Sequence, residues 1–427
     1  MKNWDRWFLA ERPSLCLGWF RVALAAAVGL HVIPSLLQMP DNYLAGTFRE
    51  YNPSFFPVSV LAWVDRSPDG LVWAMAAVFL AAWLAFLLGL FTQPSGIAMG
   101  LACYYFYARN SLHIGTLSWD IMLVTLFLML ATPYPGDCFS LDSLIRGDPE
   151  PWQRRRSFFV QSLLRMQLAA TYFFTGLAKV AGEGNWLTDN PYYYLMNATT
   201  MGVIKDFPGR EFLAGQPGLC YAIGLGVVFC ELNLWWWLWW RRTRPYAIAL
   251  GFLFHFLLLA TMHVPTNFFF LFPPQLLLFV EPEAVLGWIE ARRRAWTIRG
   301  RDRLVFDGAC GFCRAALARI QALDLFGRLL PVDFRSEDVS ALHAGLTPEA
   351  CHARLQLLEP GGRLCGGFSA LRRLSLRLPL LWPLAPWLHL PGLRRLGDPV
   401  YDWVARHRFN LLHRFRSCSD NACAARQ

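Results

Sequence analysis

Charged residues are scarce in this chain of 427 residues. Asp, Glu, Lys and Arg make up 16% of it, 55% of the residues are hydrophobic, and the mean hydropathy is +0.31. A soluble globular domain normally carries about a quarter charged residues, and disordered chains lack such apolar content. The composition therefore excludes a disordered chain, a collagen-like chain and an all-soluble globule. It indicates a membrane protein, for which the 19 Trp and 33 Phe suit lipid-facing and interfacial positions.

Cysteine and lysine are also scarce. Eleven cysteines are too few for a disulfide scaffold. Of the 40 basic residues only Lys2, Lys179 and Lys205 are lysines, so arginine is the chain's usual cation. No A-x-A cleavage motif follows the first apolar stretch, and we therefore expect a retained membrane span there rather than a signal peptide.

Positive charge is concentrated in the last third of the chain. Residues 1–280 hold 18 basic and 16 acidic residues, a net charge of +2, whereas residues 281–427 hold 22 and 14, a net charge of +8. A basic tail can bind nucleic acid, but this one directly follows apolar stretches. We therefore favour a domain beside anionic lipid over a nucleic-acid partner.

Apolar stretches long enough to span a bilayer recur through residues 1–282. They predict an α-helical polytopic membrane bundle of about eight transmembrane helices, with seven to nine as the range. The eight stretches are 15–38, 70–92, 94–108, 118–132, 157–179, 217–240, 245–262 and 266–280.

The charges of the loops predict the orientation of this bundle. With a cytoplasmic N-terminus, most arginines of the loops fall inside, including Arg154–Arg156 and Arg292–Arg294. The outside segments then carry only Arg49, Arg66, Arg109, Lys205 and Arg210. This asymmetry satisfies the positive-inside rule. We expect an inner (cytoplasmic) membrane protein with both termini and the C-terminal domain in the cytoplasm.

Ionisable residues within spans are costly and are therefore candidates for function. They are Arg21, His31, Asp120, Arg165, Lys179, Glu231 and His255. The predicted topology puts Asp120 and Lys179 near the outer face, together with His31, His113 and His263. Deeper in the membrane, Arg165 and Glu231 are expected to pair as a structural ion pair, and for each histidine a packing role is the simplest interpretation.

Lys179 differs from the other cations because the chain uses arginine almost everywhere else. An arginine cannot release its proton in a protein, whereas a desolvated lysine can. Lys179 could therefore be a base. The alternative is a lysine at a helix end that extends its ammonium to the interface.

A motif around Lys179 resembles the vitamin K-dependent carboxylase family, which contains a horizontally transferred transmembrane (HTTM) domain. The matching pieces are Tyr172-Phe173-Phe174-Thr175-Gly176-Leu177-Ala178-Lys179, Trp186, Phe20-Arg21, Trp119-Asp120, Ser140-Leu141-Asp142 and His255, within residues 10–285. The resemblance implies that Lys179 is the base that deprotonates a reduced, vitamin K-like quinone. We assign Asp120, His255, His263, Trp186 and Tyr172 to the substrate or quinone site. The extended lumenal domain of the true carboxylases is missing here.

The residue pattern of the sequence changes after residue 282. A basic amphipathic linker helix is expected over 283–301, followed by a small α/β domain over 302–415 and a tail over 416–427. Strands at 303–306 and 329–334, a helix from Cys310 to Leu323, a hairpin about Pro360-Gly361-Gly362 and two further helices follow the thioredoxin-like order.

The Cys310-Gly311-Phe312-Cys313 motif stands at the turn from the first of these strands into the helix. A helix N-terminus stabilises a thiolate, and a spacing of three residues puts the second sulfur on the same face. We expect Cys310 to be the outer, attacking sulfur and Cys313 the resolving one, forming a redox-active disulfide. The alternatives are a zinc half-site completed by Cys418 and Cys423, or two inert core cysteines.

Residues 302–415 resemble the DCC family (DUF393) of thiol-disulfide oxidoreductase-like proteins. Asp307, Cys310 and Cys313 match its Asp-x-x-Cys-x-x-Cys motif, and Gly366–Ala370 and Tyr401–Arg408 fit as well. We therefore predict a membrane oxidoreductase that couples a quinol-handling bundle to a cytoplasmic thiol domain. The partners would be the bilayer, a lipid-soluble quinone or small peptide, and a thiol or disulfide protein, with no metal. A peptide glutamate carboxylase and a non-enzymatic transporter, assembly or redox-sensing protein remain the alternatives.

Overall fold

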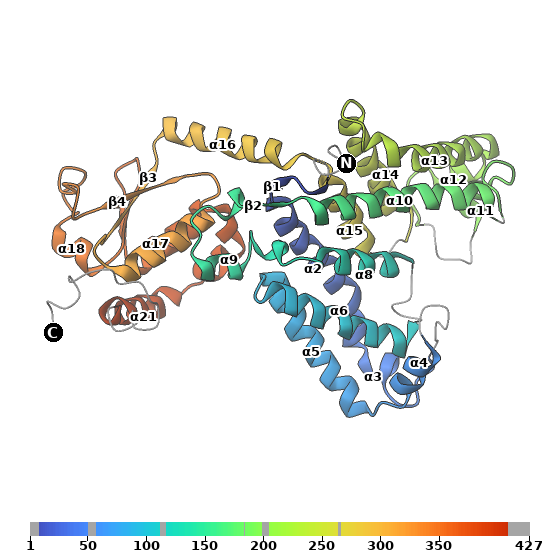
Figure 1. Ribbon diagram of the computed structural model, residues 1–427, viewed down its shortest axis with the longest axis horizontal. Helices are drawn as coiled ribbons and strands as arrows, with labels where there is room; N and C mark the ends of the chain where they lie inside the picture. The colour runs from blue at the N-terminus through green and yellow to red at the C-terminus, as the bar shows by residue number, and fades with distance from the viewer. Residues whose placement is uncertain are drawn as a thin grey trace. The chain divides into compact units, whose positions relative to one another are not determined.

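The computed structural model describes residues 8–49, 57–111, 117–182, 184–198, 205–263 and 266–408 (Figure 1). The chain divides into two compact units. The first, here called the helical unit, comprises Met1–Asp142 and Arg155–Pro282. The second, the α/β unit, comprises Ser143–Arg154 and Glu283–Gln427.

The main helices of the helical unit lie where the eight apolar stretches predict them. They are α2 (Leu15–Leu37), α5 (Asp69–Leu88), α6 (Thr92–Arg109), α8 (Leu117–Met129), α10 (Phe159–Ala181), α13 (Pro217–Trp237), α14 (Arg244–Thr261) and α15 (Thr266–Leu277). Within the described residues, α2, α5, α13 and α14 are long and apolar enough to cross a membrane. A fifth crossing follows if the broken pair Phe269–Leu277 and Pro282–Arg299 is one span. The positions of the helices are thus confirmed, whereas eight crossings stay a prediction.

Shorter elements connect these helices along the chain. They are α3 (Met39–Tyr43), α4 (Val58–Asp65), η1 (Tyr134–Gly136), α9 (Leu141–Arg146), η2 (Pro151–Gln153), α11 (Pro191–Asn197) and α12 (Arg210–Ala214). Two of them, α9 and η2, lie mostly or wholly in the Ser143–Arg154 segment of the α/β unit. Two three-residue strands, β1 (Glu11–Pro13) and β2 (Arg155–Ser157), pair antiparallel with Arg12 opposite Arg156. This ladder ties the segment before α2 to the segment before α10.

The helix α2 is the most enclosed of the four spanning candidates. It packs against α15, α5 and α8, and 56% of its apolar window is buried, against 28% for α5. The helix α5 instead exposes large apolar side chains such as Leu84, 49% exposed, and Leu88, 46% exposed. Exposed leucine on a continuous apolar helix suits contact with lipid rather than water.

Arg21 and Arg109 are two of the arginines that are buried in the helical unit and bind backbone carbonyl groups. Arg21 is fully buried and donates to the carbonyl oxygen of Phe139 at 2.5 Å. Arg109, 1% exposed, donates to the carbonyl oxygens of Tyr43 and Val64, each at 2.7 Å. Arg109 is therefore the buried last residue of α6 rather than a loop residue, and its place on the outer side stays a prediction. Its guanidinium satisfies buried acceptors at the ends of neighbouring elements, which a loop arginine would leave unpaired.

The Ser140-Leu141-Asp142 segment has a clear local role. The carboxylate of Asp142 accepts from the backbone N–H groups of Phe91 and Thr92, each at 2.8 Å, and from the Thr92 hydroxyl at 2.7 Å. These donors belong to the start of α6, where backbone N–H groups lack partners within the helix. Asp142 thus caps α6 from a distant part of the sequence.

The α/β unit contains a four-stranded mixed sheet in the order β4-β3-β5-β6. The strands are β3 (Asp302–Phe306), β4 (Leu329–Asp333), β5 (Gln356–Leu358) and β6 (Leu364–Gly366). The β3–β4 pair is parallel, and β3–β5 and β5–β6 are antiparallel. The helices of this unit are α16 (Pro282–Arg299), α17 (Gly311–Leu323), α18 (Pro348–Ala353), α19 (Phe368–Arg377), η3 (Pro379–Leu384), α20 (Ala385–Leu388) and α21 (Leu393–His407).

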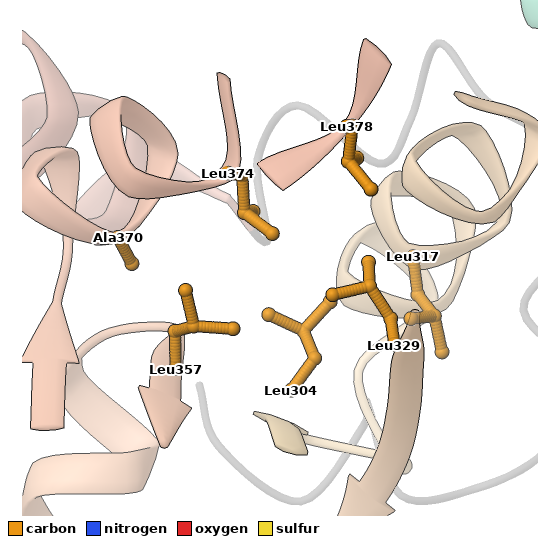
Figure 2. Packing of buried hydrophobic residues seen from close by; sticks show 7 residues of the cluster. All are labelled: Leu304, Leu317, Leu329, Leu357, Ala370, Leu374 and Leu378. Carbon is orange, nitrogen blue, oxygen red and sulfur yellow. The ribbon is translucent and has the colours of Figure 1, made fainter. Parts of the chain in front are cut away.

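Alternation along β3 builds a core on each face of this sheet. Leu304 packs with Leu317, Leu329, Leu357 and α19 on one face (Figure 2), and Val305 packs with Val332 and other residues in a second cluster. Because neighbouring side chains in a strand point to opposite faces, both clusters follow from one short apolar strand. This doubly buried strand ends at Phe306, directly before Asp307, and so fixes the position of the Cys310–Cys313 motif.

Candidate functional site

The turn between β3 and α17 is shaped by two aspartates. Asp333, at the end of β4, accepts from the Gly308 N–H at 2.9 Å. A Cβ atom at Gly308 would lie 2.0 Å from an Asp333 carboxylate oxygen, so only glycine fits there. Asp307 accepts from the Ala309 N–H at 3.1 Å, and its carbonyl oxygen accepts from the Cys310 N–H at 3.2 Å. The turn thereby places Cys310 at the N-cap of α17, directly before its first residue.

Cys310 is the N-cap residue of α17. Its sulfur accepts from the Cys313 N–H at 3.3 Å and from the Cys313 thiol at 2.7 Å, and both cysteines are free thiols. The Cys313 thiol lowers the pKa of Cys310 to about 7, and the Cys313 N–H acts in the same direction against the opposing effect of burial. The same thiol contact and burial raise the pKa of Cys313. The pair thus has one sulfur poised to ionise and one that keeps its proton.

The accessibility of the two sulfurs differs from the prediction. Cys310 is 1% exposed, whereas Cys313 is half-buried. Cys310 is therefore not the outer position of the motif. Its role as N-cap turns the sulfur back over the first turn of α17, toward the Cys313 N–H, and away from solvent.

Asp307 is buried at 2% exposure and is held by arginines that the sequence did not single out. Arg335 binds it through two contacts of 2.5 and 3.1 Å, and Arg408 lies 3.9 Å away. Burial alone would favour the neutral acid, but the Arg335 contacts outweigh it and hold the pKa of Asp307 below its ordinary value. Asp307 is therefore a carboxylate beside the thiol pair.

In the helical unit, Lys179 on α10 forms an ion pair with Glu231 on α13. The Lys179 Nζ lies 2.7 Å from Glu231 Oε2, and the two side chains are 24% and 8% exposed. The Lys179 ammonium also lies 5.6 Å from the centre of the Trp186 ring, which suits a cation–π contact. The structure thus brings together Lys179, Trp186 and an acid that the sequence had assigned to another partner.

The expected pair between Arg165 and Glu231 does not form. Arg165 instead donates to the carbonyl oxygens of Leu278 and Val280, at 2.6 and 3.3 Å. Its guanidinium also stacks 4.6 Å from the ring centre of Phe158. Carbonyl groups just beyond the end of α15 satisfy this arginine, which leaves Glu231 to Lys179.

Tyr172 and His255 form a second buried pair on α10 and α14. The Tyr172 hydroxyl lies 2.7 Å from His255 Nε2, and each residue is 3% exposed. The His255 ring stacks on Phe272 with a centroid distance of 5.2 Å. Since Tyr172 and Lys179 are seven residues apart, they lie on the same face of α10.

The contacts among the described residues do not bring the remaining predicted site residues together. His263 is exposed just after α14. Asp120 belongs to α8, but its side chain lies outside the described residues, as does all of His113. Across the described ranges, no group of three or more His, Cys, Asp or Glu could hold a metal ion. Cys418 and Cys423, the second half of the alternative zinc site, lie beyond residue 408 and are not described.

Comparison with protein families agrees with both resemblances. A family model described as HTTM domain matches residues 11–283, more than half of the chain. The chain belongs to the HTTM family. A second model, described as DCC1-like thiol-disulfide oxidoreductase, matches residues 304–414. No curated protein and no solved structure matches the chain.

This HTTM protein is thus a membrane protein whose HTTM domain is followed by a DCC1-like thiol-disulfide oxidoreductase domain. The sequence identified the candidate residues more readily than the residues that bind them. Arg335 and Arg408 follow the DCC-type motif by 28 and 101 residues from Asp307, and no spacing signal connects them. Arg408 does end the Tyr401–Arg408 segment that fits the DCC family.

Proposed function

We propose that this HTTM protein is a membrane-bound thiol-disulfide oxidoreductase whose α/β unit has a thioredoxin-like fold. The β-α-β-α-β-β-α order and the mixed sheet β4-β3-β5-β6 support the fold. The observation that carries the activity is the N-cap geometry of Cys310, which accepts hydrogen bonds from both the backbone and the thiol of Cys313.

The exchange would begin with the Cys310 thiolate. It attacks one sulfur of a partner disulfide, forming a mixed disulfide and releasing the other sulfur as a thiol after it takes up a proton. Cys313 then gives up its proton and attacks the Cys310 sulfur. The second partner thiol leaves, and the two electrons lost by the cysteine pair reside in the reduced partner. Reduction of a partner and oxidation by one are the two directions of this sequence.

Trapping tests this proposal. Cys313→Ser removes the resolving sulfur, so mixed disulfides should accumulate through Cys310 when a disulfide peptide is added. Cys365→Ser is the matched control, since Cys365 lies in β6 and not at the start of α17, where the cysteine pair lies. Equal trapping in both variants, or inert cysteines in the wild-type protein, would refute the redox assignment.

For the HTTM domain we propose the handling of a lipid-soluble quinol, with Lys179 as the base. The Lys179–Glu231 pair supports this, because Glu231 can take the proton that Lys179 must release before it acts as a base. Trp186 lies beside the ammonium, and Tyr172, which contacts His255, lies on the same face of α10 as Lys179. We assign Asp120 and His263 to the same site. Electrons would then pass between this quinol and the thiol domain.

Two substitutions separate a base from a structural lysine. Lys179→Arg keeps the charge but cannot release a proton, whereas Lys179→Ala removes both. A base predicts that both variants lose quinol-dependent oxygen uptake while the protein still inserts. Uptake retained in Lys179→Arg would leave the bundle as a scaffold, transporter or assembly module. Incorporation of carbon dioxide into a glutamate peptide would instead identify a carboxylase.

The proposed orientation places both termini and the α/β unit in the cytoplasm of the cell, at its inner membrane. The asymmetry of arginine between the loops supports it. An introduced cysteine at Ser157 should resist an impermeant thiol reagent in intact cells, whereas one at Thr188 should react. The reverse pattern would overturn the orientation.

A further inference from the structure

A cavity of about 370 Å³ adjoins the thiol pair within the α/β unit. Its volume is at the lower end of the roughly 300–1,000 Å³ that small-molecule sites occupy. Apolar side chains form most of its wall, among them Phe312, Leu317, Phe368 and Val404. Two of its polar residues, Asp307 and Arg408, lie 3.9 Å apart, and Arg335 also binds Asp307. The interior therefore suits an apolar ligand rather than a charged one.

The thiol pair meets this cavity through Cys313. Cys313 lines the cavity and is half-buried, whereas Cys310 is 1% exposed. A reactant of the pair therefore arrives through the cavity and not across the outer surface of Cys310.

The backbone beside the cavity has little capacity to dock a protein chain. Leu355, which lines the cavity just before β5, has both of its backbone groups engaged. Its N–H donates to the Tyr401 hydroxyl at 3.0 Å, and its carbonyl oxygen accepts from the Gly367 N–H at 2.9 Å. An extended peptide laid along Leu355 would find both backbone groups of this residue already engaged. A small molecule has no such requirement.

One side of α21 connects the cavity to an exposed apolar surface. Leu396, Val400 and Trp403 are 68%, 62% and 52% exposed, and their spacing of four and three residues places them on one face of the helix. Val400 also lines the cavity, so the apolar surface reaches its rim. Such a surface on a protein anchored in a membrane suits a ligand that comes from the lipid phase.

We propose that this cavity binds a lipid-soluble two-electron acceptor, either a quinone or a small apolar disulfide, which oxidises the Cys310–Cys313 pair. The inference rests on the thiol-disulfide function proposed above. The Cys310 thiolate, whose sulfur lies 2.7 Å from that of the cavity-lining Cys313, bonds to the acceptor. A quinone takes the displaced electron pair onto its oxygen, whereas a disulfide loses its S–S bond and releases its first half as a thiolate. The Cys313 thiol then loses its proton and attacks the Cys310 sulfur. The bond between Cys310 and the acceptor breaks. A Cys310–Cys313 disulfide remains, and the acceptor leaves with two electrons, one proton from Cys313 and one from solvent, as a hydroquinone or as two thiols.

Oxidation kinetics of the reduced full-length protein in lipid nanodiscs test this proposal. The acceptors are 2-methyl-1,4-naphthoquinone and diphenyl disulfide, and each is compared with a negatively charged analogue. Every oxidation rate is divided by the rate at which the same acceptor oxidises dithiothreitol. The apolar acceptors should react at least about tenfold faster than the charged ones, as expected where apolar contacts worth a few methylene groups form. A higher rate with the quinone or with the disulfide identifies which of the two classes of acceptor the cavity binds. Equal rates for apolar and charged acceptors would overturn the proposal.

A pair of matched variants locates the reaction in the cavity. Ala316 lines it, whereas Ala318, two residues along α17, does not. Ala316→Phe should fill the cavity and abolish the preference for apolar acceptors, and Ala318→Phe should retain it. An unchanged preference in a folded Ala316→Phe protein would contradict the assignment.

A binding measurement keeps this inference separate from the redox function. The unreactive 1,4-dimethoxy-2-methylnaphthalene should protect the Cys310 thiolate from N-phenylmaleimide in a saturable manner, and Ala316→Phe should remove that protection. Protection without any oxidation of the cysteine pair would refute the redox function while supporting the cavity as a binding site. Absence of protection in the wild-type protein would overturn the cavity's role.

Discussion

The two pairs of candidate residues share a distance and differ in chemistry. The Lys179 Nζ and Glu231 Oε2 are 2.7 Å apart in the helical unit, and the sulfurs of Cys310 and Cys313 are 2.7 Å apart in the α/β unit. The first pair joins a base to an acid. The second joins two weak acids of the same kind.

This difference determines where the protons lie. In an ion pair the opposite charges stabilise each other. In the thiol pair, Cys310 ionises readily chiefly because Cys313 keeps its proton and donates it as a hydrogen bond, and the Cys313 N–H acts in the same direction. The thiol pair is therefore poised to change state near neutral pH, whereas the ion pair is held by two opposite charges.

The largest expected effect comes from breaking the ion pair on one side. Glu231→Leu leaves the Lys179 ammonium without its carboxylate and should destabilise the HTTM domain by about 3 kcal/mol, the lower end for buried pairs, since Lys179 is 24% exposed. The double variant Lys179→Met/Glu231→Leu removes both charges and should recover most of this loss. Unfolding titrations in dodecyl sulfate measure both, and equal losses in the two would contradict a stabilising pair.

A smaller loss should follow from breaking the neutral pair on the same helix. Tyr172→Phe removes the hydroxyl that lies 2.7 Å from His255 Nε2 and should cost about 1–2 kcal/mol, the penalty of one buried polar atom left unpaired. Tyr246→Phe is the control, because Tyr246 is 76% exposed on α14. The same unfolding titration applies, and similar losses for both tyrosines would show that the Tyr172–His255 contact contributes nothing.

Much of the fold could be predicted from apolar periodicity and turn chemistry. The eight helical stretches, the strand before the Cys310–Cys313 motif and the hairpin about Pro360-Gly361-Gly362 all lie where the sequence predicts them. In that hairpin Gly362 has a φ of +81°, a conformation that favours glycine. The number of membrane crossings could not be fixed in the same way, because α8 and α15 have 13 and 12 residues and need about 20 to span.

The candidate site was less predictable than the fold, as the ion pair of Glu231 with Lys179 rather than Arg165 illustrates. Arg165 and Lys179 lie on nearly the same face of α10 and are about 21 Å apart along it. Glu231 on α13 could therefore have met either one. The register between the two helices decides, and tertiary packing sets that register. The burial of Cys310 could not be predicted either. It depends on the capping geometry of a single residue, which produces no periodic pattern in the sequence.

The thiol pair can be tested through the pH dependence of its reactivity. Only the thiolate reacts with iodoacetamide, so alkylation of Cys310 should rise with pH, reach half of its maximum near pH 7 and level off above it. Cys313→Ala removes the thiol donor and should move this midpoint upward, with a loss of roughly fivefold in rate at pH 7. Cys365→Ala is the control, and peptide mass spectrometry resolves the sites. A midpoint unmoved in Cys313→Ala would mean that the helix terminus alone sets the reactivity of Cys310.

The smallest effect is expected for Asp307, the acid that stands beside the thiol pair. Its negative charge raises the pKa of Cys310 only weakly, so Asp307→Asn should move the alkylation midpoint downward. The rate at pH 7 should rise by no more than about twofold, because a thiol with a pKa near 7 is already about half ionised there. Loss of the ion pair with Arg335, which is 45% exposed, should cost at most about 1 kcal/mol. These outcomes describe a residue that holds the turn. If Asp307 instead accepts the proton of Cys313 during resolution, Asp307→Asn should accumulate the mixed disulfide that otherwise only Cys313→Ser traps. Mass spectrometry of the quenched reaction distinguishes the two roles, and it would show whether the thiol pair exchanges its protons within itself or with a neighbouring carboxylate.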